Sequence, residues 1–223
     1  MKLLLLPGMD GTGELFAPFV SAVSSWGTAQ VVRYPTQECL TVDELVTRIE
    51  LSAPTIVIAE SFSGAVGIRL ASRHSDLVKQ LVLVKSFVMP PPLSGLLRGF
   101  GSLPFRVSPP HWALRRWLVG DDASDEFVSA VSRTLKQVSP SVLAHRLASI
   151  SRIDERERLS AVSVPVMTLS GRQDRLVNGA SRLVGREHFE IDGPHLLLQA
   201  RPREAAELLH ARLRSPAIPA SQE

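Results

Sequence analysis

The sequence has little cysteine, few aromatic residues and no long hydrophobic run. Cys39 is the single cysteine among 223 residues, so the chain cannot form an internal disulfide, which fits a reducing compartment. Aromatic residues make up 5%, and the arginines are scattered, whereas a nucleic-acid-binding surface needs a clustered basic stripe with aromatics beside it. No apolar run approaches the roughly 18 residues that a membrane span needs. We therefore expect a soluble cytoplasmic protein that does not bind nucleic acid.

The N-terminal stretch MKLLLLPG imitates a secretion signal, because Lys2 precedes four leucines. The apolar run is shorter than the roughly seven residues that the hydrophobic part of a signal requires. Pro7 and Gly8 then close the run without a cleavage site. We therefore predict that these leucines form a buried strand.

Short apolar runs alternate with segments of helical periodicity along most of the chain. Hydrophobic residues make up 44% and charged residues 21%, in the range of folded globular proteins, and the length fits one domain. Alternation of this kind predicts an α/β fold with a parallel sheet covered by helices. The six predicted strands span residues 2–6, 30–34, 55–59, 80–84, 164–169 and 188–191.

Two predicted helices have recognisable starts. Thr41 followed by Glu44 is a capping box, which predicts a helix beginning after Thr41. Pro202 stands at the start of a C-terminal segment whose apolar residues recur at helical spacing. Both helices are expected to pack against the sheet.

Residues 89–160 interrupt the alternation, because they contain no convincing strand and read as a series of helices. We interpret this region as a helical cap inserted into a single domain. Residues 1–88 and 161–223 then form the α/β core.

The strand at 55–59 runs into the sequence AESFSG, which places small residues two positions before and after Ser61, at Ala59 and Ser63. A nucleophile held in a sharp strand-to-helix turn needs small neighbours, since larger ones would collide with the backbone. Ser61 is therefore the candidate nucleophile. Ser63 is a poorer candidate, because it would already lie inside the helix.

A serine hydroxyl needs a base to take its proton and a third group to orient that base. Asp174 and His195 each follow a predicted strand near the end of the chain, so both should emerge at the same edge of the sheet as Ser61. The loop after the strand at 80–84 offers Lys85 and Ser86 but no carboxylate, and Asp192 is interpreted as a turn former.

These residues, in the order Ser61, Asp174 and His195, resemble the catalytic triad of the α/β-hydrolase fold family. The resemblance covers nearly the whole chain. It implies that the chain begins at the usual third strand of the family, which leaves a six-stranded sheet.

The family also needs two backbone N–H groups that bind the developing negative charge, the oxyanion hole. The resemblance implies that Phe62, directly after the nucleophile, supplies one of them. Met9 falls where the second family donor follows a His-Gly pair, although Pro7 replaces the histidine here, and Asp10 is the neighbouring candidate.

The sequence thus predicts a serine hydrolase that cleaves a carboxylic ester or a thioester of a small molecule. Two alternatives stay open: C–C bond hydrolysis or acyl transfer with the same triad, and ligand binding without catalysis. No cofactor or metal is expected, because the early glycines lack the Gly-Lys-Ser/Thr ending of a phosphate loop and no cluster has metal-ligand spacing. The sequence does not predict the oligomeric state.

Large apolar side chains gather in the predicted cap, which has no strand to bury them. Some of them must pack on the sheet, but we expect the rest to line an apolar acyl pocket above Ser61. The predicted lining residues are Phe105, Trp112 and Trp117, in a group that also includes Phe100, Leu103, Leu114, Leu118 and Phe127.

Overall fold

The computed structural model describes residues 1–91, 101–177 and 187–214. Its centre is a six-stranded sheet in which every neighbouring pair of strands is parallel, in the order β2-β1-β3-β4-β5-β6. The predicted parallel six-stranded sheet is confirmed. The strands are β1 (Lys2–Leu6), β2 (Thr28–Val31), β3 (Thr55–Glu60), β4 (Val78–Val84), β5 (Val166–Gly171) and β6 (Glu187–Ile191).

The predicted bounds were exact for β1 and wrong for β2 and β5. The second strand occupies 28–31 instead of 30–34, because Tyr34 has left the sheet and its N–H donates to the carbonyl of Gly11 at 2.7 Å. The fifth strand begins at Val166 instead of 164, directly after Pro165, which has no N–H to donate to a ladder. Apolar composition alone had placed both boundaries.

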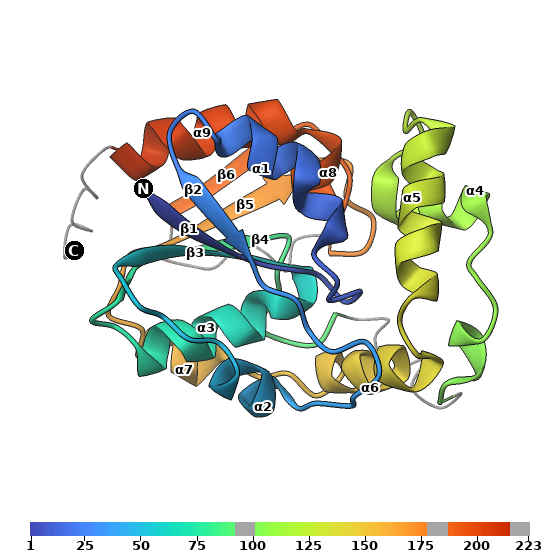
Figure 1. The fold of residues 1–223 in the computed structure, drawn as a ribbon, viewed down its shortest axis with the longest axis horizontal. Coiled ribbons are helices and arrows are strands. Elements are labelled where there is room, and N and C mark those ends of the chain that lie inside the picture. Colours follow the sequence, from blue (N-terminus) through green and yellow to red (C-terminus); the bar gives the residue numbers. More distant parts are fainter. Residues whose placement is uncertain (92–100, 178–186, 215–223) are drawn as a thin grey trace.

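Helices cover both faces of the sheet (Figure 1), and alternate residues of each central strand face opposite layers. Leu3 and Leu5 of β1 pack on the side of α1 (Ala17–Val23), α8 (Leu197–Ala200) and α9 (Pro202–Arg214). Leu4 and Leu6 pack on the side of α2 (Val42–Thr47), α3 (Gly64–Arg73) and α7 (Arg156–Ser160). Burial of both faces explains why β1 and β3 are continuous apolar runs.

Helix ends follow the local sequence. The predicted capping box begins α2: the hydroxyl of Thr41 accepts from the N–H of Glu44, and the Glu44 carboxylate accepts from the N–H of Thr41. The predicted C-terminal helix is α9, which begins at Pro202. Within the described ranges, no helix is both long and apolar enough to cross a membrane.

The described part of residues 89–160 contains helices and no strand. Its elements are η4 (Leu103–Phe105), α4 (His111–Leu114), the π-helical turn η5 (Arg115–Val119), α5 (Asp125–Lys136), α6 (Pro140–Ile150) and α7. Figure 1 shows α4 and α5 as a separate layer beyond the carboxyl ends of the strands, with α6 beneath them. This layer therefore lies at the edge where the predicted nucleophile, base and acid emerge.

Candidate active site

Ser61 is the first residue after β3 and begins the turn η2 (Ser61–Ser63), which continues into α3. Its φ of 51° lies in the left-handed region, which is costly for any residue except glycine. The turn fits only because its neighbours are small. A Cβ added to Gly64 would stand 2.6 Å from the Cβ of Ser86, and one on Gly67 would stand 2.7 Å from the Cβ of Ala59.

The structure brings the three predicted residues together at the carboxyl edge of the sheet. The Oγ of Ser61 lies 2.9 Å from Nε2 of His195, and Nδ1 of His195 lies 2.9 Å from Oδ2 of Asp174. All three side chains are buried. When Nδ1 carries the ring proton and donates it to Asp174, Nε2 is free to accept the proton of the Ser61 hydroxyl.

Asp174 is held by four donors. Oδ2 accepts a hydrogen bond from Nδ1 of His195 and lies 2.8 Å from Nζ of Lys85. Oδ1 accepts hydrogen bonds from the backbone N–H groups of Leu176 at 2.7 Å and Val177 at 3.2 Å. Burial alone would raise the pKa of Asp174, but the hydrogen bond and charge of His195, together with Lys85, hold it well below its usual value. Asp174 is therefore ionised at neutral pH.

The competing residues have other contacts. The Ser63 hydroxyl donates to the carbonyl of Pro7 and lies 2.7 Å from the hydroxyl of Tyr34, so Tyr34 must be the donor in that second bond. Asp192 accepts from the side-chain amide of Gln173 at 3.1 Å, in keeping with its predicted place in a turn. The structure thus places Ser61 and Asp174, and neither of these alternatives, in contact with His195.

The loop after β1 runs beside Ser61. A Cβ on Gly8 would stand 3.8 Å from the Cβ of Ser61. The loop closes on itself: the N–H of Gly11 donates to the Gly8 carbonyl, and Oδ1 of Asp10 accepts from the N–H and the hydroxyl of Thr12. Met9 thus follows a residue that lies beside Ser61. Its role as an oxyanion donor stays a prediction, as does that of buried Phe62.

A residue that the sequence did not single out, Arg146 on α6, holds this loop. Its Nη1 donates to the carbonyls of Met9 at 2.9 Å and Asp10 at 2.8 Å, and Nη2 donates to Pro35 at 2.9 Å. The guanidinium is buried and lies over the ring of Tyr34. A planar group with several donors can bind three carbonyls at once, which a lysine could not do in the same geometry. Arg146 thus holds the peptide planes on both sides of Asp10, which are the two that follow Met9.

The three residues predicted to line the pocket lie in different surroundings. Phe105 packs with Met9 against the cluster of Val138, Val142 and Leu143. Trp112 is 69% exposed and Trp117 39% exposed, with the Arg116 guanidinium over the Trp117 ring. The tryptophans are thus largely at the surface, while smaller residues anchor this layer: Leu114, Val119, Val128, Val131 and Leu196. Phe100 lies outside the described residues.

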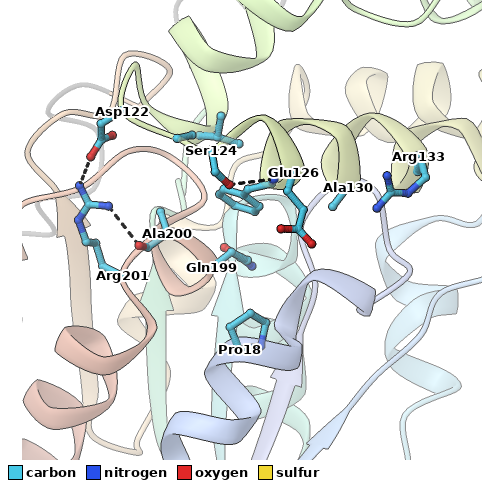
Figure 2. A pocket seen from close by; sticks show the side chains of 12 residues that line it. Pro18, Asp122, Ser124, Glu126, Ala130, Arg133, Gln199, Ala200 and Arg201 are labelled. Carbon is cyan, nitrogen blue, oxygen red and sulfur yellow. Dashed lines mark hydrogen bonds and ion pairs between the residues drawn. The ribbon is translucent and has the colours of Figure 1, made fainter.

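A second buried carboxylate, Glu60, stands directly before Ser61. Its Oε2 accepts from Nε2 of Gln199 at 2.8 Å, whereas Oε1 of Glu60 and Oε1 of Gln199 find no partner among the described residues. Burial raises the pKa of Glu60 to about 8 despite hydrogen bonds from Gln199 and from the backbone N–H of Leu198, and the nearby Asp10 carboxylate adds to the increase. Gln199 also lines a cleft of about 410 Å³ between α1, α5 and α8 (Figure 2).

Sequence signals for the missed residues exist but are weak. Lys85 ends an otherwise apolar run at the carboxyl edge of β4, and Glu60 ends β3 in the same way. A charged residue that ends a buried strand is a reason to look for a partner. Arg146 offers no comparable signal. Among the residues that the structure describes, no group of His, Cys, Asp and Glu side chains could hold a metal ion.

Comparison with known families agrees with the fold. Residues 3–208 match the model of the alpha/beta hydrolase family, and the chain belongs to that family.

Curated relatives include the pimeloyl-[acyl-carrier protein] methyl ester esterase of Neisseria meningitidis serogroup A, which is 25% identical over 174 residues. That alignment covers 73% of this chain and 55% of the relative, so the chain spans about half the length of this relative.

Solved structures share the fold at low sequence identity. The enol-lactonase from Burkholderia xenovorans LB400 has a TM-score of 0.77 at 19% identity, over 96% of this chain and 91% of that one. The bromoperoxidase from Bacillus anthracis has a TM-score of 0.81 at 16% identity, over 96% and 92%.

Proposed function

We propose that the protein is a serine hydrolase that cleaves a carboxylic ester or a thioester through an acyl-enzyme on Ser61. The observation that carries the proposal is the pair of contacts at 2.9 Å that link Ser61 to His195 and His195 to Asp174. Membership of a hydrolase family and the distant similarity to methyl ester esterases support it.

In this mechanism the Oγ of Ser61 attacks the acyl carbon while Nε2 of His195 takes the hydroxyl proton. Ionised Asp174 keeps the ring oriented and stabilises its cation. The protonated Nε2 then gives its proton to the departing alcohol or thiol. Water attacks the acyl-enzyme with His195 again as base, which releases the acid and restores the Ser61 hydroxyl.

The negative oxygen formed in each step needs donors fixed in advance. The N–H groups of Met9 and Phe62 are proposed for this role, because Gly8 lies beside Ser61 and Phe62 follows it. The helical layer over this edge is proposed to act as the cap. Its Leu118 carbonyl accepts the N–H of Leu196, the residue after His195, so the layer is tied to the base.

The test uses a fluorophosphonate probe, which reacts well only with an activated serine. Purified protein should be labelled at Ser61, and labelling should disappear in Ser61→Ala and His195→Ala. Ser63→Ala is the matched control and should still be labelled. Labelling that persists in Ser61→Ala, or no labelling of the parent protein, would overturn the proposal.

The substrate class follows from hydrolysis of an ester panel. Rates of hydrolysis of methyl and p-nitrophenyl esters of graded acyl length, compared with those of matching thioesters, show whether the protein prefers esters or thioesters. Methyl esters belong in the panel because the curated relatives are named as methyl ester esterases. If the parent protein hydrolyses none of these esters and thioesters but is still labelled by the probe at Ser61, acyl transfer or C–C bond hydrolysis by the same triad would be favoured.

A further inference from the structure

Lys85, the first residue after β4, is almost fully buried, at 2% exposure. Its Nζ lies 2.8 Å from Oδ2 of Asp174 and donates to the carbonyl of Gly171 at 3.0 Å. Lysine is rarely buried this deeply unless it is paired. The partner here is the carboxylate that orients the proposed base.

The backbone at Lys85 is unusual in the same way as the backbone at Ser61. Ser61 with φ 51° and Lys85 with φ 48° are the non-glycine residues with positive φ in the described chain. Because Glu60 pairs with Val84 in the sheet, the two residues leave adjacent strands at the same level. Glycine is the ordinary residue for this conformation, so a lysine here points to a requirement for its side chain.

Lys85 and His195 share one oxygen. Oδ2 of Asp174 faces the ammonium of Lys85 and accepts from Nδ1 of His195. A carboxylate alone would favour the protonated imidazole, and a cation on the same oxygen offsets part of that effect. Glu190 on β6 is a second carboxylate whose charge acts on Lys85.

We propose that Lys85 is a positioning residue that holds the Asp174 carboxylate against His195 and, through its positive charge, lowers the proton affinity of the imidazole. The effect on the imidazole is independent of catalysis, and its consequence for turnover rests on the proposed function. Burial lowers the pKa of Lys85, while the Asp174 carboxylate opposes that change.

The test measures the titration of the His195 ring directly. Protein with isotope-labelled histidine is titrated by NMR, and the His195 signals are assigned by their loss in His195→Gln. In Lys85→Met the ring should take up its second proton at a pH about one unit higher than in the parent protein, a tenfold change in proton affinity. Lys79→Met is the matched control, because Lys79 is on the same strand, exposed, and donates to a turn carbonyl.

Lys85→Gln keeps a donor for Asp174 but lacks the charge, and it covers the case in which Lys85→Met does not fold. In Lys85→Gln the pH at which the His195 ring takes up its second proton should rise in the same way as in Lys85→Met. An unchanged midpoint in the folded Lys85 variants would overturn the inference, whatever their activity. A displaced midpoint in a protein that neither hydrolyses esters nor reacts with the probe would overturn the proposed function and leave this inference standing.

Discussion

Two buried carboxyl groups lie near Ser61, and their surroundings favour opposite charge states. Glu60 precedes Ser61 in the chain, and Asp174 is linked to Ser61 through His195. The Asp174 carboxylate accepts hydrogen bonds from His195 and two backbone N–H groups and pairs with the ammonium of Lys85, and these contacts hold its pKa low. Glu60 is just as buried, but the groups that donate to its carboxyl group are neutral: the side-chain amide of Gln199 and the backbone N–H of Leu198. One of its oxygens has no partner in the described structure, and its pKa is raised to about 8.

The difference shows that burial does not determine the charge of a carboxyl group in this protein, whereas the number and charge of its donors do. An ionised Asp174 suits the stabilisation of a cationic imidazole. A neutral Glu60 next to Ser61 avoids a second negative charge where an oxyanion is proposed to form.

The largest expected effect follows from removing the charge of Asp174. Asp174→Asn should lower kcat/KM for ester hydrolysis by about a thousandfold or more, because the amide favours the wrong imidazole tautomer. Asp192→Asn is the matched control and should stay near the parent value. Steady-state kinetics measures both, and a reversal between the two aspartates would mean that the acid is misassigned.

The next largest effect is expected from Arg146, which holds the loop after β1 through the carbonyl of Asp10. The Asp10 carboxylate of that loop also contributes to the raised pKa of Glu60. Arg146→Met should lower kcat by about tenfold to a hundredfold with little change in KM, because misplaced donors affect the transition state selectively. Affinity for a trifluoromethyl ketone, which forms an oxyanion on the serine, should fall in parallel. Arg133→Met, at an exposed site on α5, is the control.

That expectation has a clear opposite outcome. A rise in KM at constant kcat, with inhibitor affinity retained, would show that Arg146 serves substrate binding. Addition of guanidinium to Arg146→Ala provides a further check, since partial recovery of kcat is expected if the missing group is the guanidinium itself.

Replacement of Glu60 should change stability more than turnover. Its ordinary pKa in the unfolded chain is near 4.5, so between that pH and about 8 the folded protein binds more protons than the unfolded chain. The free energy of unfolding therefore falls as pH rises through this window, by roughly 2–4 kcal/mol from this group. Glu60→Gln removes the titration and supplies an amide donor for Oε1 of Gln199.

Thermal unfolding at several pH values measures this effect. The Tm of Glu60→Gln should exceed that of the parent by about 5–10 °C at pH 9, and the difference should shrink toward pH 5. A difference that does not depend on pH would indicate that Glu60 is ionised across the range.

The smallest expected effect separates Phe105 from Trp112. Phe105 and Met9, a proposed oxyanion donor, both pack against the cluster of Val138, Val142 and Leu143, whereas Trp112 is mostly in solvent. Phe105→Ala should change the ratio of kcat/KM for octanoyl and acetyl esters by several-fold, and Trp112→Ala should change it little. If Trp112→Ala has the larger effect, the exposed tryptophan contacts the acyl chain during turnover.

The sheet and the proximity of Ser61, Asp174 and His195 could be predicted from the sequence, because both depend on local patterns and chain order. Continuous apolar runs marked β1, β3 and β4, and the carboxyl ends of parallel strands share one edge, which placed Ser61, Asp174 and His195 together. Tyr34 was misplaced because its apolar ring reads as part of a strand although it packs beneath Arg146.

Contacts between distant parts of the chain could not be predicted in this way. In the sequence, Lys85 stands in a loop that offers no carboxylate, and nothing there indicates that it pairs with Asp174. The pairing depends on the left-handed backbone at Lys85, which leaves no periodic signal in the sequence. Arg146 lies more than a hundred residues from the carbonyls it binds, and only the folded chain brings them together.

The most direct measurement is the capture of the acyl-enzyme during turnover. Parent protein is mixed with p-nitrophenyl butyrate, quenched in acid within the first turnover and analysed by intact and peptide mass spectrometry. The proposed mechanism predicts one butyryl group on the peptide that contains Ser61, and none in Ser61→Ala. Release of p-nitrophenol by the parent protein with no acyl group on Ser61, or with the group on another residue, would contradict it.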